Sequence, residues 1–583
     1  MAPRRTPRYG SDLVVDFLME RGVRYIAINP GASYRGLHDS LVNTPGAPEI
    51  ILCPHEKQAI NVAHGLANAT GEVAVSAVHD VVGLLHGTLG IFTAWHDRAP
   101  VVVLGGAGPM NSVKRRPWIE WVHTANVQGN LVRDFTKFDD QPASIEAIPS
   151  SMTRAWRVAA SQPAGPVYVA FDADIQEDPI EGPVPAYDWE RVKPATPIGP
   201  DPAGLQQVVA ELLTARRPLI IASFAGRDPA AFEQIPALAE LLGAGMIDTR
   251  HRLNFPNRHP LNAEGTDALD QADLILLLDM KNVDKPLAQE HMHERGMRSR
   301  VPEGARLIEI GFNDLHTRSW VQDLGAIVEA DVRLTADTSV ALPMLLDALR
   351  PAVEAEPAER KQQRADRRAE LGRMHDKQFA SWGDTADHAG EASPVATAWL
   401  ARETWAAVQG YDWVLAGGRP NQWTPKLWDF DRHYRLPGLQ IDTANQIATT
   451  IGVALAHRDA GRLVVNIQPD GDLMFDVGAL WIAAAHKIPM LVVMYNNKAY
   501  YNDWGHQTKV AQVRGERSDM NKVHVGIGIN PSPDFAHVAQ GFGWYAEGPI
   551  DQPGKVREAI SRAAEIVMKE RRPALVDVIC QPR

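Results

Sequence analysis

The stretch from 462 to 497 decides the fold, and it reads RLVVNIQPDGDLMFDVGALWIAAAHKIPMLVVMYNN. Its two ends, RLVVNIQ and PMLVVMY, are short runs rich in Val, Leu, Ile and Met, the composition of buried β-strands. The segment between them is long enough for a crossover helix. A strand, a crossover and a second strand predict neighbouring parallel strands of an α/β sheet.

The same alternation of apolar runs and helical patterns continues along the whole chain. In the first third the apolar runs are YIAINPG, PEIILC, VAVSAV, APVVVLGG and GPVYVAFD. In the middle they are PLIIASFAG, GAGMIDTR, ADLILLLDM, ARLIEIG and AIVEAD, and in the last third DWVLAGG, the two runs quoted above and PALVDVI. This pattern predicts an α/β fold with three doubly wound parallel-sheet domains.

Two changes in composition indicate the domain boundaries. The segment from Gly182 to Pro202 is rich in Pro and has no periodicity, as in a linker between domains. The segment 351–392 is highly charged, with ERKQQRADRRAELGRMHDKQ at its centre, and predicts a solvated connecting helix rather than a basic recognition helix. We expect domains at 1–185, 200–350 and 393–583, with the charged helical linker at 351–392.

The composition excludes several classes of function. The 583 residues include 59 Lys and Arg against 71 Asp and Glu, and no long basic stripe, so no nucleic-acid partner is expected. No apolar stretch approaches the ~20 residues that cross a bilayer. Cys53 and Cys580 are too few for a disulfide framework or a four-thiolate zinc site, which fits a reducing, cytoplasmic setting.

Polar residues follow both strands of the opening stretch. Asp470, Gly471 and Asp472 come after the first strand, and Asn496 and Asn497 end the second. Because parallel strands end at the same edge of a sheet, where α/β folds bind ligands, we expect these residues to meet. Carboxylate and amide oxygens suit Mg²⁺, which keeps open positions for diphosphate oxygens.

The run from Asp470 to Asn497 resembles the GDG…NN magnesium and diphosphate signature of the thiamine diphosphate-dependent enzymes, with Pro469 in place of the first Gly. The resemblance covers the whole chain and implies a pyrimidine-binding, a central and a diphosphate-binding domain, in that order. It implies Mg²⁺ ligands at Asp470, Asn497 and the carbonyl of Ala499, and a cofactor site of these three with Gly471 and Asp472. The family has a small residue at Asp472, where a second carboxylate beside a diphosphate is unfavourable unless it faces away or binds the metal through water.

The stretch PHEKQAINVAHGLANATG at 54–71 contains Glu56. Without the resemblance, a Glu at a helix start is explained by the helix dipole. In the family, a glutamate here hydrogen-bonds the pyrimidine of the cofactor, so that the aminopyrimidine can remove the C2 proton of the thiazolium. The family takes this glutamate and the diphosphate site from different subunits. The resemblance therefore implies that Glu56 is catalytic and cofactor-binding, and that the protein is a homodimer or homotetramer with active sites at the subunit interface.

Domain order and length are similar to the acetolactate synthase and benzoylformate decarboxylase branch of the family. The stretch VHDVVGLLHGTLGIFTAW at 78–95 resembles the benzoylformate decarboxylase segment with a catalytic histidine, which falls on His79. An imidazole that titrates near neutrality is suited to moving protons, so His79 is the predicted acid or base. The alternative is a histidine that is merely hydrogen-bonded at a strand end.

The stretch MNSVKRRPWIEWVHTA at 110–125 lies where acetolactate synthases have a Gln-Glu pair. Ile119 takes the Gln position, flanked by Trp118, Glu120 and Trp121, which suits a substrate larger or less polar than pyruvate. The alternative is that the tryptophans belong to the core or a subunit interface. Nearby Lys114, Arg115 and Arg116 either attract a carboxylate or a coenzyme A phosphate or form a solvated basic turn.

Two further comparisons concern the cofactors. Acetolactate synthases hold FAD with a glycine-rich loop of the central domain, and the matching LIIASFAGRDP at 219–229 has no run of glycines, so FAD is not expected. The family also supports the bent cofactor with a bulky apolar residue. Alignment places Thr443 there, which leaves Ile441, Ile447 or a different mode of support.

We therefore expect a thiamine diphosphate and Mg²⁺-dependent lyase or transferase that decarboxylates or ligates a 2-oxo acid with an apolar or aromatic side chain. One alternative is a 2-hydroxyacyl-CoA lyase, which is less expected because the sequence ends directly after PALVDVI, without a segment to cover a CoA ester. The other is a catalytically silent cofactor-binding relative, which has no chemical need for Glu56.

Overall fold

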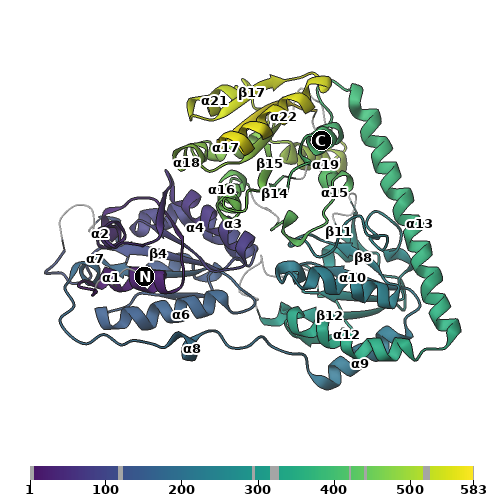
Figure 1. Cartoon of the computed structure of the whole chain (residues 1–583), viewed down its shortest axis with the longest axis horizontal. Helices are drawn as coiled ribbons and strands as arrows, with labels where there is room; N and C mark the ends of the chain where they lie inside the picture. Colours follow the sequence, from purple (N-terminus) through teal and green to yellow (C-terminus); the bar gives the residue numbers. More distant parts are fainter. Residues whose placement is uncertain are drawn as a thin grey trace. The chain divides into compact units, whose positions relative to one another are not determined.

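The computed structural model describes residues 6–115, 122–291, 296–315, 327–418, 422–438, 443–516 and 526–581 (Figure 1). Its strands form three parallel sheets of six, five and five strands, and one antiparallel pair, β10 (Ala288–His291) with β11 (Gly296–Ser299). Helices pack on the parallel sheets, so the predicted α/β class is confirmed. Among the described residues, no helix combines the length and apolarity needed to cross a membrane.

The first sheet has the strand order β2-β1-β3-β4-β6-β5. Its strands are β1 (Tyr25–Ile28), β2 (Glu49–Leu52), β3 (Ala74–Val78), β4 (Val101–Ala107), β5 (Phe138–Asp140) and β6 (Val167–Asp172). One core contains residues of α1 (Gly10–Glu20), α2 (Arg35–Asn43) and α6 (Ile148–Ala160), and the other contains residues of α3 (Glu56–Thr70) and α4 (Asp80–His96). The sheet is therefore doubly wound. Its order reverses between β1 and β3, and ligands bind after the carboxyl ends of strands at such a reversal.

The central sheet has the parallel order β13-β12-β9-β7-β8. Its strands are β7 (Pro218–Ala222), β8 (Gly245–Asp248), β9 (Leu274–Leu278), β12 (Arg306–Gly311) and β13 (Val332–Thr335). The predicted strand on AIVEAD is wrong, because its described residues, 327–331, form no strand. The strand begins at Val332, where buried and exposed residues alternate along the ladder with β12.

The third sheet has the parallel order β14-β15-β16-β18-β17. Its strands are β14 (Trp413–Gly417), β15 (Leu463–Pro469), β16 (Leu491–Asn496), β17 (Tyr545–Ile550) and β18 (Ala574–Ile579). Along the ladder between β15 and β16, Pro469 is level with Tyr495. The residues that follow these two strands therefore start from the same edge of the sheet, as the sequence predicts.

The charged segment that was predicted to be a helical linker contains α13 (Ala358–His388), the long green helix of Figure 1. It is not solvated on all sides, because Arg364 and Arg367 are buried on it. Arg364 Nη1 donates to the carbonyl of Leu242 (2.8 Å) and Arg367 Nε to that of Gly243 (2.6 Å). These carbonyls lie at the C-terminus of α10 (Ala231–Leu242), so the two arginines cap that helix.

The chain divides into two compact units. One combines Met1–Thr196 with Gln440–Asp459 and Asp476–Ile488, and the other contains the remaining segments. In the first unit α3 crosses α16 (Gln446–His457) at very short range. A Cβ on Gly65 would lie 1.9 Å from the carbonyl oxygen of Thr449, and one on Gly452 would lie 2.0 Å from that of Val62. Only glycine fits at either position.

Gly65→Ala is expected to lower the free energy of unfolding by more than about 3 kcal/mol, the upper end of overpacking costs, because two helix backbones must separate. Urea unfolding followed by circular dichroism measures the change. The matched control is Gly383→Ala on α13, where an added Cβ meets no heavy atom within 4 Å. The control is expected to be unchanged or slightly more stable, since Ala favours a helix over Gly. Equal stability of the two variants would contradict the close crossing.

Candidate functional site

Glu56 lies at the carboxyl edge of the first sheet, as the first residue of α3. It is 6% exposed, so its carboxylate is held within the protein rather than in water. The N-cap of the helix is His55, whose Nδ1 accepts the backbone N–H of Lys57 (3.1 Å). The Lys57 ammonium forms its ion pair with Asp476 (3.2 Å).

A glycine of α4 brings Glu56 and His79 together. His79 is the N-cap of α4, and Gly83 lies in the first turns of that helix. A Cβ on Gly83 would lie 3.0 Å from Glu56 Oε1 and 3.2 Å from the Cβ of His79. The glycine therefore lets α4 pack against both side chains, and the two predicted catalytic residues are neighbours.

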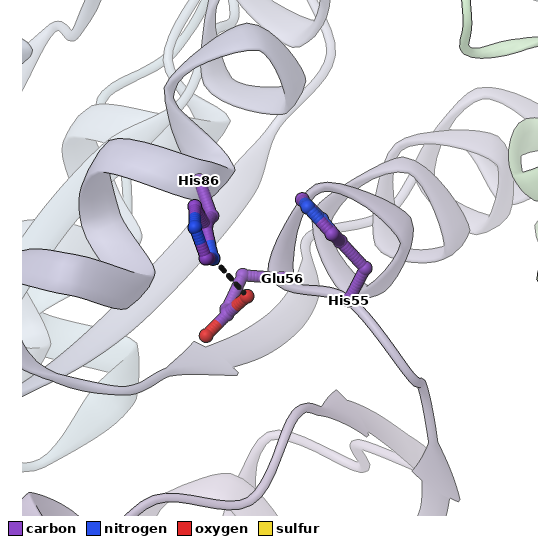
Figure 2. A group of neighbouring side chains, drawn as sticks. All are labelled: His55, Glu56 and His86. Carbon is purple, nitrogen blue, oxygen red and sulfur yellow. Dashed lines mark hydrogen bonds and ion pairs between the residues drawn. The ribbon is translucent and has the colours of Figure 1, made fainter. Parts of the chain in front are cut away.

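Two histidines that the sequence analysis did not select lie beside Glu56 (Figure 2). His86 Nδ1 is hydrogen-bonded to Glu56 Oε2 at 3.1 Å. The His86 ring stacks on the ring of His55, with centroids 4.9 Å apart and an interplanar angle of 27°. His86 lies three residues after Gly83 on α4, so both lie on one face of that helix, but only the fold shows that this face meets Glu56.

His79 is held by residues from two other loops. Its Nδ1 is hydrogen-bonded to Ser33 Oγ (2.9 Å), and its Nε2 to Nδ1 of His123 (3.3 Å). Burial and the neighbouring His123 lower the pKa of His79, while Glu56 opposes the shift. Gly31 makes room for the ring, since a Cβ there would lie 2.4 Å from His79.

The stretch NPGASY, which includes Gly31 and Ser33, is therefore a positioning loop for His79. His123 was not selected because no motif marks it.

Asp470 lies at the carboxyl edge of the third sheet, where it begins α17 (Asp470–Asp476). Burial raises the pKa of its carboxyl to about 6, while nearby backbone N–H groups, including those of Gly471, Lys498 and Ala499, oppose the rise. Its Oδ2 is buried and has no hydrogen-bond partner among the described residues. A buried carboxylate oxygen without a partner is costly, and a bound cation would satisfy it.

The two asparagines at the end of β16 and directly after it have different surroundings. Asn496 is fully buried and donates to Asp577 Oδ1 (3.1 Å). Asn497 is half-buried, and its Oδ1 accepts the N–H of Ala499 (3.1 Å). The structure thus brings the loop of Asn497 and Ala499 to Asp470, as predicted, and leaves Asn496 in the core.

Gly471 and Asp472 complete the predicted cofactor residues. A Cβ on Gly471 would lie 2.9 Å from the ring of Tyr500, so only glycine allows that ring to approach. Asp472 Oδ2 accepts from Nε2 of Gln468 (2.8 Å). This amide offsets part of the unfavourable charge that the sequence analysis identified at Asp472.

Several predicted residues lie away from the residues above or outside the described part of the chain. Six of them lie outside the described residues: Arg116, Trp118, Ile119, Glu120, Trp121 and Ile441. Lys114 pairs with Asp178, and Arg115 Nε donates to the carbonyl of Pro109 (3.0 Å). Of the residues considered as supports for the bent cofactor, Thr443 is exposed and Ile447 is fully buried on α16.

The donor set at the third sheet fits a magnesium diphosphate. It offers the partnerless Oδ2 of Asp470, the amide oxygen of Asn497 and the carbonyl of Ala499, which are hard oxygen ligands. Few protein ligands are typical of Mg²⁺, which keeps positions for phosphate oxygens. Glu56, at the first sheet, offers the buried carboxylate that an aminopyrimidine needs.

Comparisons with known proteins agree with these observations. The N-terminal TPP-binding domain of the thiamine pyrophosphate enzymes matches residues 8–131, and the C-terminal TPP-binding domain matches residues 416–578. The acetolactate synthase of Bacillus subtilis (strain 168) is 25% identical over 96% of both chains. The acetolactate synthase isozyme 3 large subunit of Escherichia coli (strain K12) is 24% identical over 98% of this chain and 94% of its own.

Among solved structures, the benzoylformate decarboxylase of Polynucleobacter necessarius has the same fold, with a TM-score of 0.74 at 18% identity over 99% of both chains. Both cofactor-binding domains of the family are thus present in one chain, and full-length relatives match it from end to end. The predicted resemblance to the acetolactate synthase and benzoylformate decarboxylase branch is confirmed, and the chain belongs to the thiamine pyrophosphate enzymes.

Proposed function

We propose that this enzyme decarboxylates or ligates a 2-oxo acid with an apolar or aromatic side chain, using thiamine diphosphate and Mg²⁺. The observation that supports the proposal is that Glu56 and His79 both lie against Gly83, on the same chain as the oxygen ligands at Asp470. The first pair suits proton transfer, and the second suits a metal diphosphate. A catalytically silent relative would need neither His79 for proton transfer nor Glu56 for activation of the cofactor.

When bound, thiamine diphosphate supplies a carbon nucleophile and an electron sink for the bond next to the carbonyl. Asp470, Asn497 and the carbonyl of Ala499 would hold Mg²⁺. Glu56 would accept a hydrogen bond from the pyrimidine ring, and its burial would exclude water from that bond. Gly471 and Asp472 belong to the turn that carries the metal site.

His79 moves the proton at the reacting carbon or at the carbonyl oxygen of the substrate. Burial keeps its imidazole neutral near pH 7 because it lowers the pKa, so His79 starts as a proton acceptor. Ser33 and His123 contact its two ring nitrogens and fix the orientation of the ring.

We also propose a homodimer, or a dimer of dimers, with active sites at the subunit interface. Leu85 and Leu89 are 55% and 40% exposed on α4, on either side of His86. An exposed apolar helix face beside the proposed site fits burial by a second copy. Both cysteines are free and buried, which supports a cytoplasmic setting. Light scattering after gel filtration measures the oligomeric state, and a monomer at micromolar concentration would contradict the dimer.

Product analysis tests the proposed reaction. The full-length protein, with thiamine diphosphate and Mg²⁺, is incubated with pyruvate, benzoylformate or a 2-hydroxyacyl-CoA ester, each with and without an aldehyde acceptor. We expect carbon dioxide, or a hydroxyketone, from benzoylformate in preference to pyruvate. A preference for pyruvate would contradict the proposal that the 2-oxo acid substrate has a large apolar or aromatic side chain. Turnover of the CoA ester alone would instead support the alternative function, a 2-hydroxyacyl-CoA lyase.

His79→Ala is expected to lower kcat by about 10²–10⁴-fold, the typical contribution of an acid or base, with thiamine diphosphate binding unchanged. His123→Ala should cost less, because it contacts the ring rather than the substrate. Steady-state kinetics and a cofactor titration give both quantities. The control is His38→Ala, an exposed histidine of α2. If His79→Ala retains full kcat, His79 is only a hydrogen-bonded histidine at a strand end.

A further inference from the structure

His55, Glu56 and His86 form a cluster with the composition of a transition-metal site (Figure 2). One ligand atom of each residue lies within 4.8 Å of the others. His86 Nδ1 and Glu56 Oε2 are 3.1 Å apart. Bonds of about 2.0–2.2 Å to one Zn²⁺ ion span a separation of this size, so the pair needs little movement to share an ion.

The surroundings of the cluster allow an ion to enter. They also allow His55 to supply the third ligand. In the single chain the His86 side chain is 60% exposed, whereas that of Glu56 is 8% exposed, so the cluster has a buried anion and, before a second copy covers α4, an open side. His55 Nδ1 accepts the N–H of Lys57, which leaves its Nε2 as the ligand atom. The charge of Lys57 is already paired with Asp476 and adds little repulsion.

The ligand types select the metal. Two imidazoles and one carboxylate suit Zn²⁺, Co²⁺ or Ni²⁺, whereas Mg²⁺ prefers oxygen ligands throughout. This cluster is therefore chemically distinct from the magnesium residues at Asp470. An open side leaves one or more positions to water, as in zinc sites with three protein ligands.

We infer that His55, Glu56 and His86 bind a divalent transition ion such as Zn²⁺, and that this ion and thiamine diphosphate exclude each other. The exclusion rests on the proposed function of Glu56, because the ion takes the carboxylate that the pyrimidine ring requires. The metal site itself does not depend on that function. Zn²⁺ would then hold the enzyme in a cofactor-free, inactive state until it is removed.

The site is tested on the full-length protein after removal of metals with a chelator. Zn²⁺ is titrated by calorimetry, and Co²⁺ by its visible absorption, into the unaltered protein, His86→Ala, His86→Gln and the control His38→Ala. We expect the unaltered protein to bind one ion at this site, and His86→Ala and His86→Gln to lower the affinity at least about tenfold. The absorption bands of tetrahedral Co²⁺ should be lost in both variants. His38→Ala should bind as the unaltered protein does. Equal affinities and spectra in all four proteins would overturn the site.

The exclusion is tested by titrating thiamine diphosphate, at saturating Mg²⁺, with and without Zn²⁺. We expect Zn²⁺ to raise the apparent Kd of the cofactor in the unaltered protein and to have a much smaller effect in His86→Ala. Both proteins keep the site at Asp470, so displacement of Mg²⁺ there affects them equally. Cofactor binding that ignores Zn²⁺ would overturn the exclusion. Absence of cofactor binding without Zn²⁺ would instead contradict the proposed function, and the metal titration would still decide the site.

Discussion

Asp470→Asn is expected to weaken Mg²⁺-dependent binding of thiamine diphosphate by two orders of magnitude or more. The substitution keeps the size of the side chain and one oxygen that faces the nearby backbone N–H groups. It removes the charge and replaces one carboxylate oxygen, such as the partnerless Oδ2, by an amide nitrogen, which does not bind Mg²⁺. Loss of a metal contact of this kind exceeds the roughly 10–100-fold cost of altering only an outer partner.

Calorimetric titration of the cofactor with and without Mg²⁺ measures this effect. The control is Asp503→Asn, an exposed acidic residue of α19 (Tyr501–Val513), for which no change is expected. Thermal unfolding shows whether each variant is folded. A folded Asp470→Asn that binds the cofactor as tightly as the unaltered protein would contradict the metal site at the third sheet.

Glu56→Gln is expected to lower kcat by about 10²–10⁴-fold on whichever 2-oxo acid the protein turns over. Glutamine fills the same space against Gly83 and can still hydrogen-bond His86, so the fold and the cofactor site should persist. It cannot, however, stabilise a protonated pyrimidine ring as a carboxylate does. The loss should therefore appear in kcat more than in the Kd of the cofactor.

Single-turnover kinetics with saturating thiamine diphosphate measure this loss. The control is Glu72→Gln, an exposed glutamate just after α3, which should have the kcat of the unaltered protein. If Glu56→Gln retained kcat but bound the cofactor weakly, Glu56 would be a binding residue and not the activating one.

Most of the sheet strands could be predicted because their residues are apolar throughout. β9 reads LILLL and is fully buried, and such a run indicates a parallel strand without further information. β17 (YAEGPI) was missed because it is partly exposed and contains Gly548 and Pro549, which normally indicate a turn. AIVEAD was misassigned because composition does not reveal which residues pair with β12.

The site was predictable where the chemistry lies in a continuous motif. Glu56, and Asp470 with Asn497, lie in such motifs, and the structure gives them buried or edge positions that suit their proposed roles. His86 and His123 were missed because their contacts join residues 30 and 44 positions apart in the sequence. Contacts of that range depend on helix crossings, such as that at Gly83, which no local pattern specifies.

The measurement that tests the central claim most directly is the exchange of the C2 proton of thiamine diphosphate for deuterium, with Mg²⁺, followed by quenched NMR. It needs no knowledge of the substrate. The account predicts rapid exchange on the unaltered protein and slow exchange on Glu56→Gln. Equally slow exchange on both proteins, with the cofactor bound, would contradict the claim that Glu56 activates the cofactor for catalysis.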